Sequence, residues 1–150
     1  MAHTLTNLLT HVVFSTKNRE PFIAPALRKD LWPYLGGIVR NLDGHAVIIG
    51  GTADHVHLLV ELGPATSLSD AVRTIKASSS KWVHETHAEQ SAFAWQTGYG
   101  AFSVSRSNRD AVTEYINGQE EHHSRLGFKE EFLLILKKHG IEFDERYIWE

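Results

Sequence analysis

The fold is decided by residues 46–61, which read Ala-Val-Ile-Ile-Gly-Gly-Thr-Ala-Asp-His-Val-His-Leu-Leu-Val-Glu. Two apolar runs flank a loop that contains two glycines, and this pattern predicts a β-hairpin with strands over 46–49 and 55–61. Alternate side chains of a strand share one face. His55 and His57 therefore point the same way, while the valine between them turns into the core.

The periodicity of the rest of the chain predicts further elements around this hairpin. They are a strand over 5–15, a helix over roughly 25–42 that Pro33 should kink or restart, a helix opened by Ser67-Leu68-Ser69-Asp70, a strand over 99–105, a helix from 108 to about 122, and a helix near 128–139. The order β-α-β-β-α-β followed by two helices predicts an α+β protein of the ferredoxin-like split βαβ type. We expect an antiparallel sheet with helices on one face plus C-terminal helices, in a single domain over residues 1–150.

Composition limits the classes of protein that the chain can belong to. With 150 residues and 42% hydrophobic content the chain can bury a substantial core. There are no cysteines, which excludes disulfides and thiolate ligands. The N-terminus lacks a signal-peptide pattern and no apolar run is long enough for a bilayer, so we expect a cytoplasmic protein without membrane contact.

Charge does not by itself indicate nucleic-acid binding. The net charge is −3. Residues 1–110 hold 10 basic and 9 acidic side chains, and residues 111–150 hold 5 and 9, so the acidic surplus lies in the C-terminal part. A DNA-binding function must therefore depend on local patches and on a bound cation rather than on the global field.

The two strand histidines form a candidate metal site. Neutral imidazoles can bind one divalent ion and leave coordination positions free for phosphate oxygens. The spacing alone is weak, because 10 histidines in 150 residues give about 0.7 His-x-His pairs by chance. Two surface or locally hydrogen-bonded histidines are the alternative.

The helix expected over 108–122 carries a second pair of candidates, Tyr115 and Gln119. Their spacing of four residues puts them on one helix face. A tyrosine can attack a phosphate whose charge is neutralised by a metal ion, and a glutamine oxygen suits Mg²⁺ or Mn²⁺. An amphipathic tyrosine with an exposed neighbour remains the simpler interpretation of the spacing.

These motifs together resemble the single-tyrosine HUH transposases of the insertion-sequence 200/605 type. The resemblance covers nearly the whole chain. It is carried by residues 11–19 (HVVFSTKNR), 51–60 (GTADHVHLLV), 78–82 (SSSKW), 95–105 (WQTGYGAFSVS), 115–123 (YINGQEEHH) and 138–149 (KHGIEFDERYIW).

The resemblance implies a function and a set of roles. His55, His57 and Gln119 would hold Mg²⁺ or Mn²⁺ on the scissile phosphate of single-stranded DNA, and Tyr115 would attack to leave a 5′-phosphotyrosine and a free 3′-OH. It also implies hairpin-marked DNA ends as the partner, and a homodimer in which the tyrosine helix can act in trans. Tyr115 can then stand far from His55 of its own chain.

Three other interpretations stay open at this point. One is a domesticated relative that cuts and rejoins repeated palindromes; another is a non-catalytic ferredoxin-like domain that binds nucleic acid or a ligand; the third is a metal-dependent hydrolase with water as nucleophile. Basic residues that could follow DNA phosphates are Lys17, Arg19, Arg73, Lys76 and Lys81. For His122 and His123 we expect exposed or structural roles.

Overall fold

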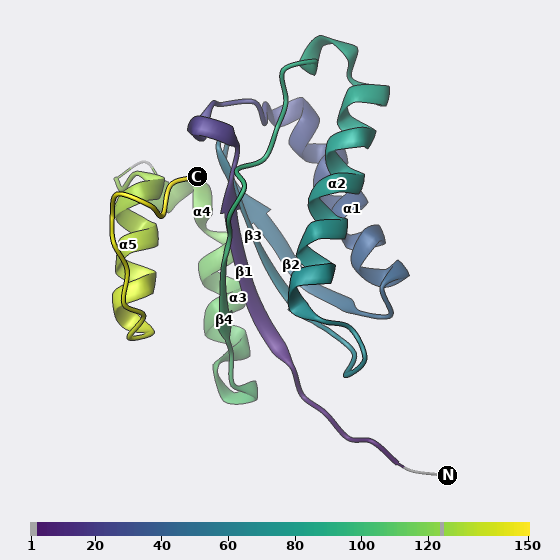
Figure 1. The fold of residues 1–150 in the computed structure, drawn as a ribbon, viewed down its shortest axis with the longest axis vertical. Helices are drawn as coiled ribbons and strands as arrows, with labels where there is room; N and C mark the ends of the chain where they lie inside the picture. Colours follow the sequence, from purple (N-terminus) through teal and green to yellow (C-terminus); the bar gives the residue numbers. More distant parts are fainter. Residues whose placement is uncertain (1–2, 124) are drawn as a thin grey trace.

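The computed structural model describes residues 3–123 and 125–150 and contains one four-stranded sheet with helices on both faces (Figure 1). In chain order the elements are β1 Leu9–Ser15, the 3-10 turn η1 Lys17–Arg19, α1 Pro25–Asn41, β2 His45–Gly51, β3 His55–Glu61, α2 Leu68–Thr86, η2 Ala88–Gln90, β4 Gly100–Ser103, η3 Arg106–Asn108, α3 Arg109–Asn117, α4 Gln119–His123 and α5 Phe128–Lys138.

The sheet has the order β2-β3-β1-β4, and all of its pairings are antiparallel. This is the arrangement of a ferredoxin-like split βαβ fold, which confirms the expected α+β class. β3 occupies a central position between β2 and β1, with Ser15 of β1 opposite His55 and Val13 opposite His57. The histidine pair therefore lies on an interior strand near the end of β1.

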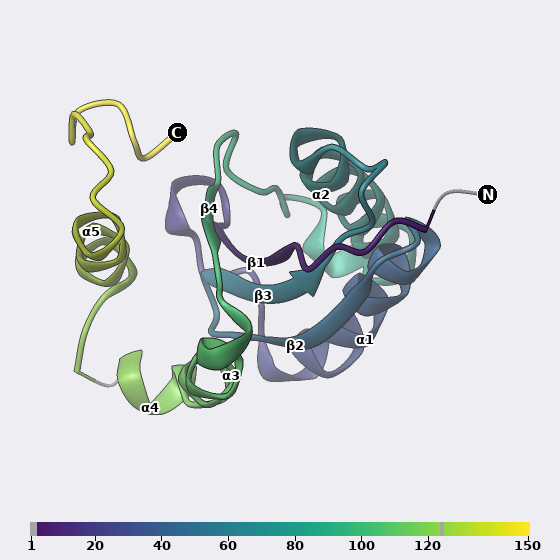
Figure 2. The same ribbon diagram turned by 90° about the horizontal axis from the view of Figure 1, so that it is seen from below.

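The two faces of the sheet are covered by different helices, as the view in Figure 2 shows. On one face α1 and α2 pack on Val12, Val56 and Leu58, which belong to the main apolar core. On the other face α5 packs on Val13 with Phe102, and α3 packs on Leu59 through Ile116. The C-terminal helices therefore cover the face toward which the two histidines point.

The first strand and the first helix differ from the sequence expectations at defined places. The strand expected over 5–15 begins only at Leu9, because Leu5 is 93% exposed and has no core to pack against. The helix runs through Pro33 as one element rather than restarting. Proline frees the carbonyl four residues earlier, and both Pro33 and Lys29 are on the exposed side, where water can satisfy that group.

The helix expected from 108 to about 122 is interrupted. α3 ends at Asn117, Gly118 has φ −94° and ψ 18°, and α4 begins at Gln119. A glycine inside a helix weakens it by about 1 kcal/mol, which is consistent with a break there. The capped start at Ser67 is confirmed, because its side chain accepts a hydrogen bond from the Asp70 backbone N–H at 3.1 Å.

Among the described residues, every helix is too short or too polar to span a bilayer.

Candidate functional site

Two buried histidines on β3 form the floor of the candidate site. The side chains of His55 and His57 are fully buried, and their ring centroids lie 5.1 Å apart. They point to the face covered by the C-terminal helices, whereas Val56 packs in the opposite core. This alternation is what the strand periodicity predicts.

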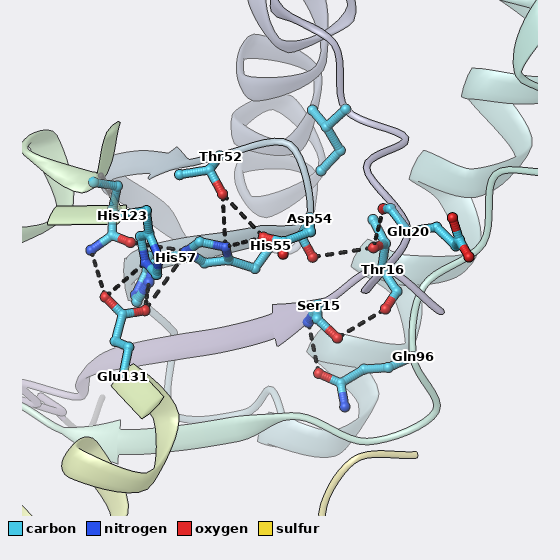
Figure 3. A network of polar contacts seen from close by, with 12 residues as sticks. Ser15, Thr16, Glu20, Thr52, Asp54, His55, His57, Gln96, His123 and Glu131 are labelled. Atoms are coloured by element: carbon cyan, nitrogen blue, oxygen red, sulfur yellow. Dashed lines mark hydrogen bonds and ion pairs between the residues drawn. The ribbon is translucent and has the colours of Figure 1, made fainter. Parts of the chain in front are cut away.

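Neighbouring side chains fix the outer nitrogen of each ring. His55 Nδ1 lies 2.7 Å from Asp54 Oδ1 and 2.9 Å from Thr52 Oγ1 (Figure 3). His57 Nδ1 lies 2.8 Å from His11 Nε2. When Nδ1 carries the proton and donates it to such a partner, the Nε2 lone pair is free for a metal ion. Both histidines are therefore held in orientations that present Nε2 to the same space.

The broken helix brings Tyr115 and Gln119 to this space in the same chain. Gln119 is buried, and its Oε1 lies 2.9 Å from His55 Nε2. The ring of Tyr115 lies 5.8 Å from the ring of His57, centroid to centroid. The expectation that Tyr115 can stand far from its own histidines does not describe this arrangement, in which one chain brings both halves together.

A glutamate from α5, Glu131, lies between these groups. Its Oε1 lies 2.9 Å from His57 Nε2 and 3.7 Å from His55 Nε2. Its Oε2 accepts hydrogen bonds from the Tyr115 hydroxyl and from Gln119 Nε2, the second at 3.1 Å. Figure 3 shows Glu131 reaching from its helix to His57. The side chain is 2% exposed, so it is part of the interior of the site.

His123 of α4 completes the cluster. Its Nε2 lies 3.2 Å from Glu131 Oε2, and its ring lies 4.3 Å from the ring of His55. His122 instead packs its ring 4.9 Å from that of Tyr115 and is exposed. The structural or exposed role expected for the two residues describes His122, whereas His123 is half-buried within the candidate site.

The site keeps His57 and Glu131 in the forms that favour cation binding. Burial acts to lower the pKa of His123, but the Glu131 carboxylate outweighs it and raises that pKa. Burial lowers the pKa of His57, and burial together with His57 lowers the pKa of His11 to about 3, so these two rings are neutral near pH 7. Burial acts to raise the pKa of Glu131, but the adjacent His123 and His57 outweigh it and hold that pKa below its usual range. Burial and the Glu131 carboxylate raise the pKa of Tyr115, which keeps the phenol protonated.

The donor atoms fit a divalent cation. The metal-binding atoms of His55, His57, His123 and Glu131 all lie within 4.8 Å of one another. Octahedral coordination with bonds near 2.1 Å places adjacent ligand atoms about 3 Å apart. The 2.9 Å separations of His55 Nε2 from Gln119 Oε1, and of His57 Nε2 from Glu131 Oε1, match this spacing without rearrangement.

The five basic candidates for DNA contact do not form one surface. Lys17 is exposed and Arg19 is partly exposed on the turn after β1, which ends beside His55. Arg73 and Lys81 are exposed on α2, which covers the opposite face of the sheet from the histidines. They are engaged in ion pairs along that helix, Arg73 with Asp70 at 2.9 Å and Lys81 with Glu85 at 3.9 Å.

Lys76 has a different environment from the other lysines of α2. Its ammonium donates to the backbone carbonyls of Gln96, Thr97 and Gly98 at 2.8, 3.1 and 2.5 Å. Burial lowers its pKa to about 8. The geometry favours a structural role, because a phosphate contact would require Lys76 to give up these bonds.

Glu131 and the inward position of His123 were missed by the sequence interpretation. A signal for Glu131 was nevertheless present, because it lies in the apolar stripe of its helix, three residues after Phe128 and four before Ile135. Carboxylates are almost never buried on such a stripe unless they are paired. For His123 the sequence holds no comparable signal, because the break at Gly118 changes the face on which it lies.

Comparison with known proteins identifies a family that this chain matches. The IS200-like transposase family matches residues 4–119, most of the chain. The transposase of insertion sequence element IS200 from Salmonella typhimurium is 26% identical over 126 residues, which cover 81% of this chain and 82% of the relative. The ISDra2 transposase TnpA from Deinococcus radiodurans is 22% identical over 116 residues, covering 74% and 83%.

Two solved structures share the fold. A putative transposase from Deinococcus radiodurans has a TM-score of 0.64 at 22% identity and covers 79% of this chain and 95% of its own. A REP-associated tyrosine transposase bound to a REP hairpin has a TM-score of 0.62 at 12% identity, with coverages of 84% and 74%. The fold agrees with the family match over residues 4–119, and the chain therefore belongs to the IS200-like transposases.

Proposed function

We propose that this transposase cleaves and rejoins single-stranded DNA at hairpin-marked ends through a covalent 5′-phosphotyrosine on Tyr115. In this proposal His55, His57 and Gln119 hold Mg²⁺ or Mn²⁺ at the scissile phosphate, and residues 1–150 act as one catalytic unit in the cytoplasm, where its DNA substrate is found. The observation that carries the proposal is the convergence of Tyr115, Gln119 and the histidine pair on one buried carboxylate.

The covalent step can be written with its atoms balanced. The phenolic oxygen of Tyr115 bonds to phosphorus as the P–O3′ bond breaks, the phenolic proton is released, and the departing O3′ takes up a proton to become a 3′-OH. A 3′-OH from another strand reverses the step by attacking the phosphotyrosine and regenerating the phenol. Rejoining therefore needs neither water as a nucleophile nor ATP.

The residues around Tyr115 position its hydroxyl and the two imidazoles for this attack. A bound divalent ion would neutralise charge on the phosphate oxygens, which a phenol of raised pKa requires. The Tyr115 hydroxyl is held by Glu131 beside the two imidazoles, so the nucleophile and the metal-binding atoms share one location. Asp54 and His11 fix the two imidazole orientations.

The hairpin partner is inferred from the family and from a relative. One structural neighbour is described as bound to a REP hairpin, and we expect hairpin DNA to be the ligand here. Exposed Lys17 is the candidate phosphate contact here, because it lies two residues after Ser15, which pairs with His55 in the sheet. Because contacts between basic side chains and phosphates release counterions, we expect this binding to weaken with salt.

A covalent-adduct assay tests the proposal. The full chain is incubated with 3′-labelled single-stranded hairpin DNA and Mn²⁺, and an SDS-resistant protein–DNA adduct is sought on a denaturing gel. The wild type should form the adduct, and Tyr115→Phe should lose it while binding the hairpin with unchanged affinity. Tyr99→Phe changes an exposed tyrosine whose ring lies 5.7 Å from the Lys76 ammonium of α2; it is the matched control and should keep full activity.

The same assay separates the competing functions. Cleavage by Tyr115→Phe without an adduct would favour a hydrolase that uses water. Hairpin binding by the wild type without cleavage, with metal and a cognate element end supplied, would favour a non-catalytic binding domain. Rejoining of repeated palindromes that flank no mobile element would identify a domesticated relative.

Mixing two inactive variants tests how the site is assembled. Since one chain places Tyr115 beside its own His57, we propose assembly in cis within a homodimer. A mixture of Tyr115→Phe and His57→Ala should then form no adduct. Restored adduct formation would show that the tyrosine helix serves the partner's histidines in trans.

A further inference from the structure

We propose that Glu131 of α5 is a further protein ligand of the divalent ion, and that the same carboxylate positions Tyr115 beside it. This inference rests on the proposed metal-dependent function and adds a residue to the site. Oxygen Oε1 would ligate the ion, while Oε2 holds the nucleophile. α5 would then be part of the catalytic centre rather than only a cover for the sheet.

The two carboxylate oxygens have different neighbours, and this division carries the argument. Oε1 faces the histidine pair, 2.9 Å from His57 Nε2 and 3.7 Å from His55 Nε2. Ligands of one octahedral ion with bonds near 2.1 Å are spaced by about 3 Å. The distance of Oε1 from His57 Nε2 matches this spacing, and Oε1 lies farther from His55 Nε2, so Oε1 would be a ligand beside His57.

The other carboxylate oxygen, Oε2, contacts three further side chains of the site. It accepts from the Tyr115 hydroxyl and from Gln119 Nε2 at 3.1 Å, and His123 Nε2 lies 3.2 Å away. Gln119 turns its own Oε1 toward His55 at 2.9 Å. The amide thus points its oxygen to the metal-binding space and its nitrogen to the carboxylate, so the two side chains support each other's orientation.

The charge balance also calls for a cation. Glu131 is 2% exposed, and burying a carboxylate is costly unless an opposite charge accompanies it. Among the described residues its ion-pair contacts are with His55, His57 and His123 only, and none is with a lysine or arginine. A divalent ion among these groups would add positive charge beside this carboxylate, with hard oxygen and imidazole ligands.

The competing possibility is that Glu131 only closes the apo site by hydrogen bonds and gives way when metal arrives. The two roles predict opposite effects of removing the charge. A ligand strengthens metal binding, so its loss weakens affinity. A competitor must be displaced, so its loss strengthens affinity.

Binding of Mn²⁺ alone to the full chain distinguishes them. The affinity is measured by calorimetry and by the electron paramagnetic resonance signal of free Mn²⁺, without DNA. Glu131→Gln keeps the shape of the side chain and removes its charge, and we expect it to bind Mn²⁺ at least about tenfold more weakly. Glu130→Gln removes the same charge from the exposed adjacent position and should bind as the wild type does.

Each outcome has a definite meaning. Unchanged or tighter binding by Glu131→Gln, with binding lost in His55→Ala, overturns this inference but leaves the proposed metal site intact. Absence of Mn²⁺ binding in the wild type overturns both. If Glu131→Gln lacks a cooperative thermal transition, Glu131→Asp replaces it. This shorter carboxylate should bind Mn²⁺ more weakly than the wild type, and wild-type affinity in it would overturn the inference.

Discussion

The two faces of strand β3 differ sharply in what they bury. On the side of α1 and α2, Val56, Leu58 and Val60 join one continuous apolar core. On the side of α3 and α5, His55 and His57 lie among polar groups, flanked by two smaller apolar clusters. Adjacent residues of one strand thus belong to a dry core and to a polar site.

This difference indicates that the two faces of the sheet have different roles. Close packing of aliphatic side chains stabilises the fold, while the opposite face keeps ionisable groups away from water in fixed orientations. A buried polar network is costly to leave incomplete. The large core behind the sheet provides the stability with which the fold can carry such a network.

Replacing one residue on each face should separate stability from activity most clearly. Leu58→Ala removes a fully buried side chain from the α1/α2 core and should lower the free energy of unfolding by about 2–5 kcal/mol. Urea unfolding followed by circular dichroism measures this change. Below its unfolding transition the variant should still form the covalent DNA adduct.

The counterpart of Leu58 on the other face of β3 is the adjacent residue, His57. His57→Ala should lower adduct formation at least about a hundredfold, because it removes a proposed metal-binding nitrogen. Adduct formation is measured with the hairpin substrate and Mn²⁺. The comparison fails if Leu58→Ala is inactive while folded, or if His57→Ala remains active.

Much of the fold could be predicted from local sequence patterns. The alternation around His55 gave strand bounds of 55–61, which the structure reproduces in β3, and the cap at Ser67 fixed the start of α2. The strand over 5–15 was too long because apolar residues near the N-terminus meet no partner. The helix over 108–122 was too long because its apolar stripe continues past Gly118, where the backbone leaves the helix.

The residues of the candidate site could be predicted from the sequence only in part. His55, His57, Tyr115 and Gln119 were selected from spacing and resemblance, and the fold brings them together. Glu131 was not selected, because its contact with His57 joins residues 74 positions apart, and helix periodicity carries no information about which strand a helix meets. Its place on the apolar stripe of α5 was the remaining local clue.

A smaller effect is expected at Lys76 on the α2 side of the sheet. Lys76→Met removes hydrogen bonds from an ammonium to three backbone carbonyls and should destabilise the fold by about 1–3 kcal/mol. Hairpin affinity at fixed salt should not change. Lys81→Met, on the exposed side of the same helix, should alter stability by less than about 0.5 kcal/mol. A loss of hairpin affinity confined to Lys76→Met would instead assign that lysine to DNA.

The effect that is smallest near pH 7 and grows in acid concerns pH, and it tests the polar face directly. His11 is buried, and its pKa falls from 6.5 to about 3 on folding. Between these values the unfolded chain binds more protons than the folded one, so stability must fall as the pH drops from about 6.5 toward 3. One such group contributes a slope of up to about 1.4 kcal/mol per pH unit.

His11→Gln keeps an acceptor for His57 Nδ1 and cannot titrate, so urea unfolding at pH 4 to 8 should show a flatter dependence of stability on pH than the wild type. His45→Gln, at an exposed position of β2, should keep the wild-type slope. If His11→Gln kept that slope as well, His11 would not be held neutral, and the polar face would tolerate charge that its burial should exclude.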